Sequence, residues 1–96
     1  MKTYVILRRE GWRSAEDLER VAERSTEVGE QMPDDVRWIR SYVLEEANGT
    51  VGTVCIYEGN SPEAIRRHAS QADLPVDEII QVAGTVIVRP DPVAAG

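Results

Sequence analysis

The sequence predicts an α+β domain whose elements follow in the order β-α-β-β-α-β. Three observations support this prediction: four short runs of strand-forming residues, two helix-start signals, and an Asn-Gly pair between the two middle runs. A chain of 96 residues is long enough for one domain around a single core. We expect that domain over residues 1–89 and a flexible C-terminal tail over residues 90–96, which contain two prolines.

The first strand and the first helix are predicted from the N-terminal third of the chain. Residues 3–9 are rich in β-branched and aromatic side chains and end close to Gly11. Ser14 can cap the turn that follows, and Asp17 occupies the reciprocal position of a capping box. Apolar residues then recur at helical spacing as far as Val28, so we expect an amphipathic helix with one face in water.

The two middle strands are predicted over residues 36–46 and 50–58, where they form a hairpin. Asn48 and Gly49 lie between them and suit the positive φ values of a tight two-residue turn. This loop predicts a register in which the numbers of paired residues sum to 97.

Side chains of a strand alternate between two faces, and the hairpin residues divide accordingly. One set is apolar and suits a buried face against the helices: Ile39, Val43, Val54 and Ile56. The other set is aromatic and polar: Trp38, Arg40, Tyr42, Cys55 and Tyr57. We expect the second set on an uncovered face, where it is available to a partner, a ligand or a second subunit.

The second helix and the last strand are predicted from the C-terminal third. Ser61 is suited to cap a helix that has Pro62 at its first position, where proline loses no hydrogen bond. Pro75 closes this segment, and residues 76–80 are interpreted as a short helical turn. Residues 81–88 are predicted to form the last strand.

This order of elements is that of the ferredoxin-like fold, a four-stranded antiparallel sheet with two helices on one face. The other sheet face is left bare, and a bare face with tryptophan and tyrosine is costly in water unless something covers it. We therefore expect a homodimer through this face, since tryptophan, tyrosine and arginine are favoured interface anchors. The same aromatic residues can also stack on a flat ligand, with Arg40 holding an acid group.

Charge and composition exclude several classes of partner. There are 17 acidic and 11 basic residues, which give a net charge of −6 and repel phosphate backbones and anionic lipid. We therefore expect neither nucleic acid nor a membrane as a partner. A single cysteine and a start without a long apolar signal segment favour the cytoplasm.

The residues capable of chemistry are few. The sequence has no glycine-rich phosphate loop, no paired-cysteine motif and no nucleophile elbow. His68 is the single histidine, and it is either a partly buried helix residue or a ligand or proton shuttle. Glu58 ends the third strand on the predicted helix side, so we expect it to meet His68 at the sheet edge. Cys55 is either a small strand residue or a thiolate, and its predicted face separates it from His68.

Three short motifs resemble one known family. They are W-I-x-S-Y-V at residues 38–43, C-x-Y-E at residues 55–58 and R-x-H-A at residues 66–69. In this order they resemble a family of small bacterial proteins long catalogued as a domain of unknown function, one branch of which is described as nickel-binding. The resemblance implies a ferredoxin-like dimer that binds nickel or another divalent transition metal. A site of this kind would use His68 with Glu58 or another carboxylate, or ligands shared across the dimer.

Three functions remain open at this point. The preferred one is a small dimeric binding protein for a metal or a small ligand, without catalysis. The second is a small enzyme of the dimeric α+β-barrel type, whose aromatic pocket between sheet and helices accepts a hydrophobic or aromatic molecule. The third is a protein-interaction domain without a small ligand.

Overall fold

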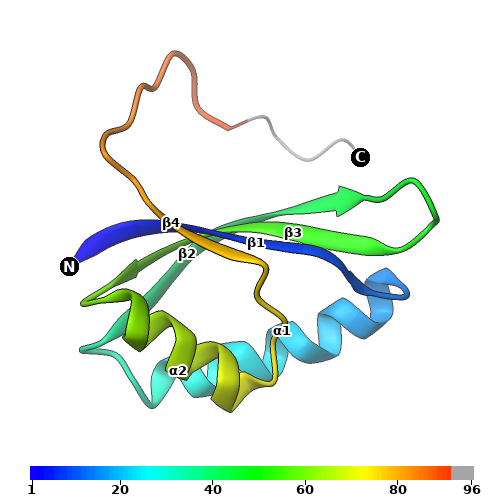
Figure 1. The fold of residues 1–96 in the computed structure, drawn as a ribbon, viewed down its shortest axis with the longest axis horizontal. Helices are drawn as coiled ribbons and strands as arrows, with labels where there is room; N and C mark the ends of the chain where they lie inside the picture. Colours follow the sequence, from blue (N-terminus) through cyan, green and yellow to red (C-terminus); the bar gives the residue numbers. More distant parts are fainter. Residues whose placement is uncertain (92–96) are drawn as a thin grey trace.

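A computed structural model describes residues 1–91 of the chain. Its elements are β1 (Lys2–Trp12), α1 (Ala15–Glu30), β2 (Val36–Glu45), β3 (Val51–Gly59), α2 (Pro62–Ala72) and β4 (Glu78–Gln81). The strands form one antiparallel sheet in the order β2-β3-β1-β4, and both helices cover the same face (Figure 1). The predicted ferredoxin-like α+β fold is confirmed. None of the helices within residues 1–91 is long and apolar enough to cross a membrane.

Both helices begin where the capping residues predict. The Ser14 side chain accepts a hydrogen bond from the Asp17 amide at 3.3 Å, and Ser61 accepts one from the Ala64 amide at 3.1 Å. Pro62 occupies the first turn of α2. The inward side of α2 buries five residues, namely Ala64, Ile65, His68, Ala69 and Ala72. The core therefore lies between these helices and the covered face of the sheet.

The loop between β2 and β3 differs from the predicted two-residue turn. The Glu46 amide donates to the Thr50 carbonyl at 3.0 Å, and the Gly49 amide donates to the Glu46 carbonyl at 3.1 Å. Gly49 has a φ of 85°, which a glycine adopts without steric cost. This is a three-residue loop with a left-handed glycine, and it shifts the register by one residue, so that Tyr42 pairs with Val54. The predicted register was wrong.

The division of the hairpin between two faces was also wrong, because β2 contains a bulge and because the shifted register puts Cys55 and Tyr57 on the face opposite to Tyr42. Trp38 pairs with Tyr57 whereas Arg40 pairs with Ile56, so the extra residue Ile39 puts Trp38 and Arg40 on opposite faces. Tyr57 is buried under the helices, as is Cys55. Of the five residues predicted on the uncovered face, only Arg40 and Tyr42 lie there; Trp38, Cys55 and Tyr57 lie on the helix side.

The last strand lies earlier in the chain than predicted. Residues 78–81 pair with β1, although a helical turn was expected over residues 76–80 and the strand only from residue 81 onward. Ile79 pairs with Ile6 and packs against the core, which places the strand here. Residues 82–91 leave the sheet and pass on the side opposite to the helices (Figure 1). The Asp91 carboxylate accepts hydrogen bonds from Arg40 Nη1 at 2.9 Å and from the Tyr42 hydroxyl at 2.8 Å. The rest of the predicted tail, residues 92–96, lies outside the described residues.

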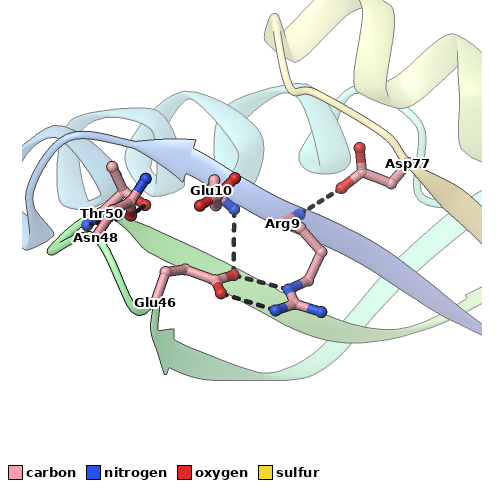
Figure 2. Close-up of polar contacts among 6 residues, drawn as sticks. All are labelled: Arg9, Glu10, Glu46, Asn48, Thr50 and Asp77. Carbon is pink, nitrogen blue, oxygen red and sulfur yellow. Dashed lines mark hydrogen bonds and ion pairs between the residues drawn. The ribbon is translucent and has the colours of Figure 1, made fainter.

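A polar cluster ties the end of β1 to the hairpin loop, as Figure 2 shows. Arg9 donates from Nε and Nη2 to the two Glu46 carboxylate oxygens, both at 2.8 Å, and the Glu10 amide donates to Glu46 at 3.2 Å. The Arg9 amide donates to the Asp77 carboxylate. The hydrogen bonds from Arg9 lower the pKa of Glu46 to about 2. Since Glu10 has a φ of 51° at an irregularity in β1, the cluster stabilises the bend that returns Trp12 to the helix side.

Candidate functional site

A cavity of about 450 Å³ lies between the covered face of the sheet and α1. Its apolar and aromatic lining comes from five parts of the chain: Trp12, Leu18, Trp38, Ile39, Val43, Tyr57 and Leu74. Polar residues that line it are Arg8, Ser25, Arg40, Ser41, Thr53 and Cys55, and Glu19 borders it from α1. This combination of apolar walls with a few polar groups is typical of small-molecule sites.

The edge strand β2 forms one side of the cavity. The bulge at Ile39 turns Trp38 toward the helices, where its ring stacks on Tyr57 with centroids 6.0 Å apart and planes 9° apart. Trp38 Nε1 donates to the Ser41 hydroxyl at 2.8 Å, which fixes the indole orientation. Trp38, Ile39 and Val43 are exposed as well as lining the cavity, so the cavity is open along the β2 edge.

Arg8 contributes a buried positive charge to the cavity wall. Its side chain is 1% exposed, and its Cζ lies 5.8 Å from the centroid of the Tyr57 ring. Within residues 1–91, Nε, Nη1 and Nη2 of Arg8 have no hydrogen-bond partner. Glu19, the carboxylate that borders the cavity, is exposed on α1, and no ion pair joins it to Arg8. Buried charges are normally paired, so this guanidinium is an exception that calls for a ligand or a function.

A chain of hydrogen bonds lies behind Tyr57. The Tyr57 and Ser25 hydroxyls are 3.3 Å apart, and His68 Nε2 lies 3.1 Å from the Ser25 carbonyl oxygen. A carbonyl only accepts, so Nε2 carries the proton and donates it. Burial lowers the pKa of His68, and the charge of Arg8 lowers it further. The hydrogen bond to the Ser25 carbonyl raises it, but the net effect is a lowered pKa. His68 is therefore neutral near pH 7, and its Nδ1 is a buried acceptor without a partner in the described part of the chain.

Burial likewise raises the pKa of Tyr57, which the Ser25 hydrogen bond and the nearby Arg8 guanidinium oppose. Arg8 lies close to the phenol, but the contact does not have hydrogen-bond geometry. The phenol therefore stays protonated near neutral pH. Cys55 lies on the same face, where its thiol donates to the Thr53 hydroxyl at 3.2 Å. Cys55 and His68 were predicted on opposite faces, and the structure places both on the covered one.

His68 and Glu58 do not meet. Glu58 pairs with Thr3 and Arg37 and alternates with Tyr57, so its side chain lies on the uncovered face. His68 lies on the covered face, with its ring centroid 5.4 Å from that of Tyr57. In residues 1–91, histidine, cysteine and acidic side chains form no group of three or more that could hold a metal ion. A metal held by His68 together with Glu58 does not fit this arrangement, although His68 also lines a second hollow, of about 400 Å³, with Glu30 and Asp34.

Sequence reasoning missed Arg8 and Trp12 as site residues. A signal for Arg8 was present, since it follows Tyr4 and Ile6 at strand spacing and all three share the buried face. Trp12 has the same even spacing and is buried too, but it lies beyond residues 3–9, over which the first strand was predicted.

Comparisons with known proteins agree with this fold. Residues 4–82 match the family described as SCO4226-like, nickel responsive protein SCO4226-like. The crystal structure of SCO4226 from Streptomyces coelicolor A3(2) is similar with a TM-score of 0.70 and 19% sequence identity, over 88% of this chain and 99% of that chain. At that identity the likeness supports the fold alone. No curated protein matches the chain.

Proposed function

The chain belongs to the SCO4226-like family of nickel-responsive proteins, and we propose that it is a dimeric binding protein for a hydrophobic small molecule. The cavity between the sheet and α1 carries this proposal. Its two tryptophans and its aliphatic side chains provide the apolar surface that such a ligand buries. A location in the cytoplasm, expected from the sequence, is part of the same proposal.

The size of the cavity suits a small ligand. Its volume of about 450 Å³ falls within the range of about 300–1,000 Å³ that is typical of small-molecule sites. Trp38, Ile39 and Val43 keep apolar surface exposed at its opening, which a bound hydrophobic molecule would cover.

Calorimetric titration with 1-naphthaleneacetamide, a neutral aromatic probe, tests this function. Ala22 lines the cavity from α1, so Ala22→Phe should fill the space and abolish binding. Ala15 is exposed at the start of the same helix, and Ala15→Phe is the matched control that should bind like the unmodified protein. If Ala22→Phe binds the probe as tightly as the unmodified protein does, the probe lies outside the cavity and the proposal is contradicted.

In the proposed dimer, the second subunit packs on the sheet face that the helices leave uncovered. Val5, Leu7, Val54 and Ile56 are half-buried on that face, beside the exposed Tyr42 and Ile80. Residues 82–91 pass on the same side of the sheet (Figure 1) and add three strongly exposed apolar side chains. Their exposed fractions are 92% for Val86, 78% for Ile87 and 82% for Val88. An apolar surface of this extent favours a partner, and a second copy supplies the same apolar surface in a self-complementary contact.

Sedimentation velocity tests the dimer. We expect a dimer at micromolar concentration and a monomer for Ile87→Asp, because the aspartate would bury a charge in an apolar contact. Val43→Asp is the control, since Val43 is also apolar and exposed but lies on the helix side. A monomeric unmodified protein would refute this part of the proposal.

Nickel binding is a second candidate function, which the description of the family favours. His68 is the single histidine, and it borders the hollow that Glu30 and Asp34 also line. Calorimetric titration with nickel, zinc and copper ions, repeated with His68→Ala, tests this role. Glu58→Gln is the matched control, since Glu58 faces the other side of the sheet. Unchanged nickel affinity in His68→Ala would remove His68 from any metal site.

A further inference from the structure

We propose that the cavity selects hydrophobic carboxylates, which Arg8 holds through its guanidinium. This inference rests on the proposed binding function and names the chemical class of the ligand. Arg8 is 1% exposed, lines the cavity, and has three nitrogens without a hydrogen-bond partner in residues 1–91.

An unpaired buried charge is costly, because the group loses its hydration without gaining hydrogen bonds. The neighbours of Arg8 do not remove this cost. The face of Tyr57 attracts the cation only weakly at 5.8 Å, and His68 is neutral. Glu19 is exposed and unpaired with Arg8. A ligand anion in the cavity supplies what the protein lacks at this point once the guanidinium, whose nitrogens are covered in the ligand-free structure, turns toward it.

The charge and shape of the site favour a carboxylate over other anions. A guanidinium presents a planar fork of donors that matches the two oxygens of a carboxylate. Within residues 1–91, Arg8 is the only cationic side chain buried in the core. Arg40 also lines the cavity but is exposed and paired with Asp91, so the site balances one negative charge and not two. The hydroxyls of Thr53 and Ser41 accept from Cys55 and Trp38, which leaves their own O–H groups free to donate to a ligand oxygen.

The rest of the cavity determines the other half of the ligand. Trp12 and Trp38 offer flat aromatic surfaces, and Ile39 and Val43 offer aliphatic ones at the open side. These side chains suit a ring or hydrocarbon chain that extends from the carboxylate toward the β2 edge. The positive charge of Arg8 also disfavours a free metal cation in this cavity.

The test compares two probes of the same shape, 1-naphthaleneacetate and the neutral 1-naphthaleneacetamide, by calorimetry on the full chain. We expect the unmodified protein to bind the carboxylate at least about tenfold more tightly, as a charge-assisted hydrogen bond provides. Arg8→Met should abolish this preference and keep the amide affinity within about threefold of the unmodified value. Arg66→Met removes an exposed arginine of α2 and should keep the preference.

The outcomes separate the inference from the function on which it rests. Equal affinity for acid and amide in the unmodified protein would refute carboxylate selection and leave the hydrophobic binding function standing. Binding of neither probe would overturn both. If Arg8→Met fails to fold, the preference for the acid over the amide is measured in Arg8→Lys instead. This variant keeps the positive charge and loses the planar fork. We expect it to retain only part of the preference, and a full preference would refute the forked contact.

Discussion

Replacement of Arg8 by methionine should stabilise the ligand-free protein, although it removes a core side chain. Methionine keeps much of the length of the arginine stem and removes the charged head. The three guanidinium nitrogens are buried and unbonded in residues 1–91, so their removal abolishes an unfavourable contribution to folding.

The magnitude follows from the contacts of Arg8. Its contact with the Tyr57 ring at 5.8 Å contributes about 1 kcal/mol that methionine does not replace. In the opposite direction, each buried polar group without a hydrogen bond destabilises the folded state by about 1–3 kcal/mol. Hydrophobic replacements of buried charges are often stabilising by about 1–4 kcal/mol, and we expect a gain in this range.

Urea denaturation at one fixed protein concentration measures this change. For a domain of 96 residues, each kcal/mol also raises Tm by roughly 4–8 °C, which thermal unfolding detects independently. Arg66→Met, on the exposed face of α2, should change the free energy of unfolding by less than about 0.5 kcal/mol. A loss of more than about 1 kcal/mol in Arg8→Met would refute the reasoning, because it would mean that the guanidinium is well satisfied without a ligand.

Three further predictions concern pH and packing. The lowered pKa of His68 means that the unfolded chain binds a proton which the folded chain does not, so stability should fall as pH drops below about 6.5. Urea unfolding at pH 7.5 and 5.5 measures this loss, which His68→Gln should reduce; an equal loss in the variant would contradict the assignment. Glu46, with a pKa of about 2 in the fold, contributes stability that is lost as pH falls below about 4.5. Glu46→Gln should show a smaller acid-induced loss in circular dichroism melts, and an unchanged pH profile would exclude the Arg9 contact as its cause. Gly52→Ala should destabilise by about 1–3 kcal/mol, since a Cβ would lie 2.6 Å from the Arg8 carbonyl oxygen. Gly84→Ala, with open space around it, is the control in the same denaturation assay.

The order of elements could be predicted because its signals are local. Ser14 and Ser61 cap the helices through side-chain contacts with amides three residues away. Alternation in β1 and helical spacing in α2 likewise depend on neighbours along the chain. The fold class follows from these local signals and the handedness of strand crossovers.

The faces of the hairpin could not be predicted, because bulges break the alternation on which the prediction rests. One extra residue at Ile39 reverses the side on which Trp38 lies relative to Arg40. The three-residue loop shifts the pairing by one residue, and its Asn-Gly pair is compatible with either loop. The predicted contact between His68 and Glu58 failed for this reason.

The last strand shows tertiary packing overriding local preference. Residues 85–88 have the stronger strand composition, yet they lie outside the sheet. Ile79 pairs with Ile6 and packs on the core, which sets the position of β4. The cavity itself agrees with the aromatic pocket that the enzyme alternative expected between sheet and helices, although Arg8 was not among its predicted residues.

A crystal structure of the protein with 1-naphthaleneacetate tests most directly whether Arg8 holds a carboxylate. We predict that the carboxylate oxygens lie within about 3 Å of the Arg8 guanidinium nitrogens, with the ring system against Trp12 and Trp38. The contrary result is a naphthalene ring bound elsewhere, or bound in the cavity with its carboxylate directed away from Arg8.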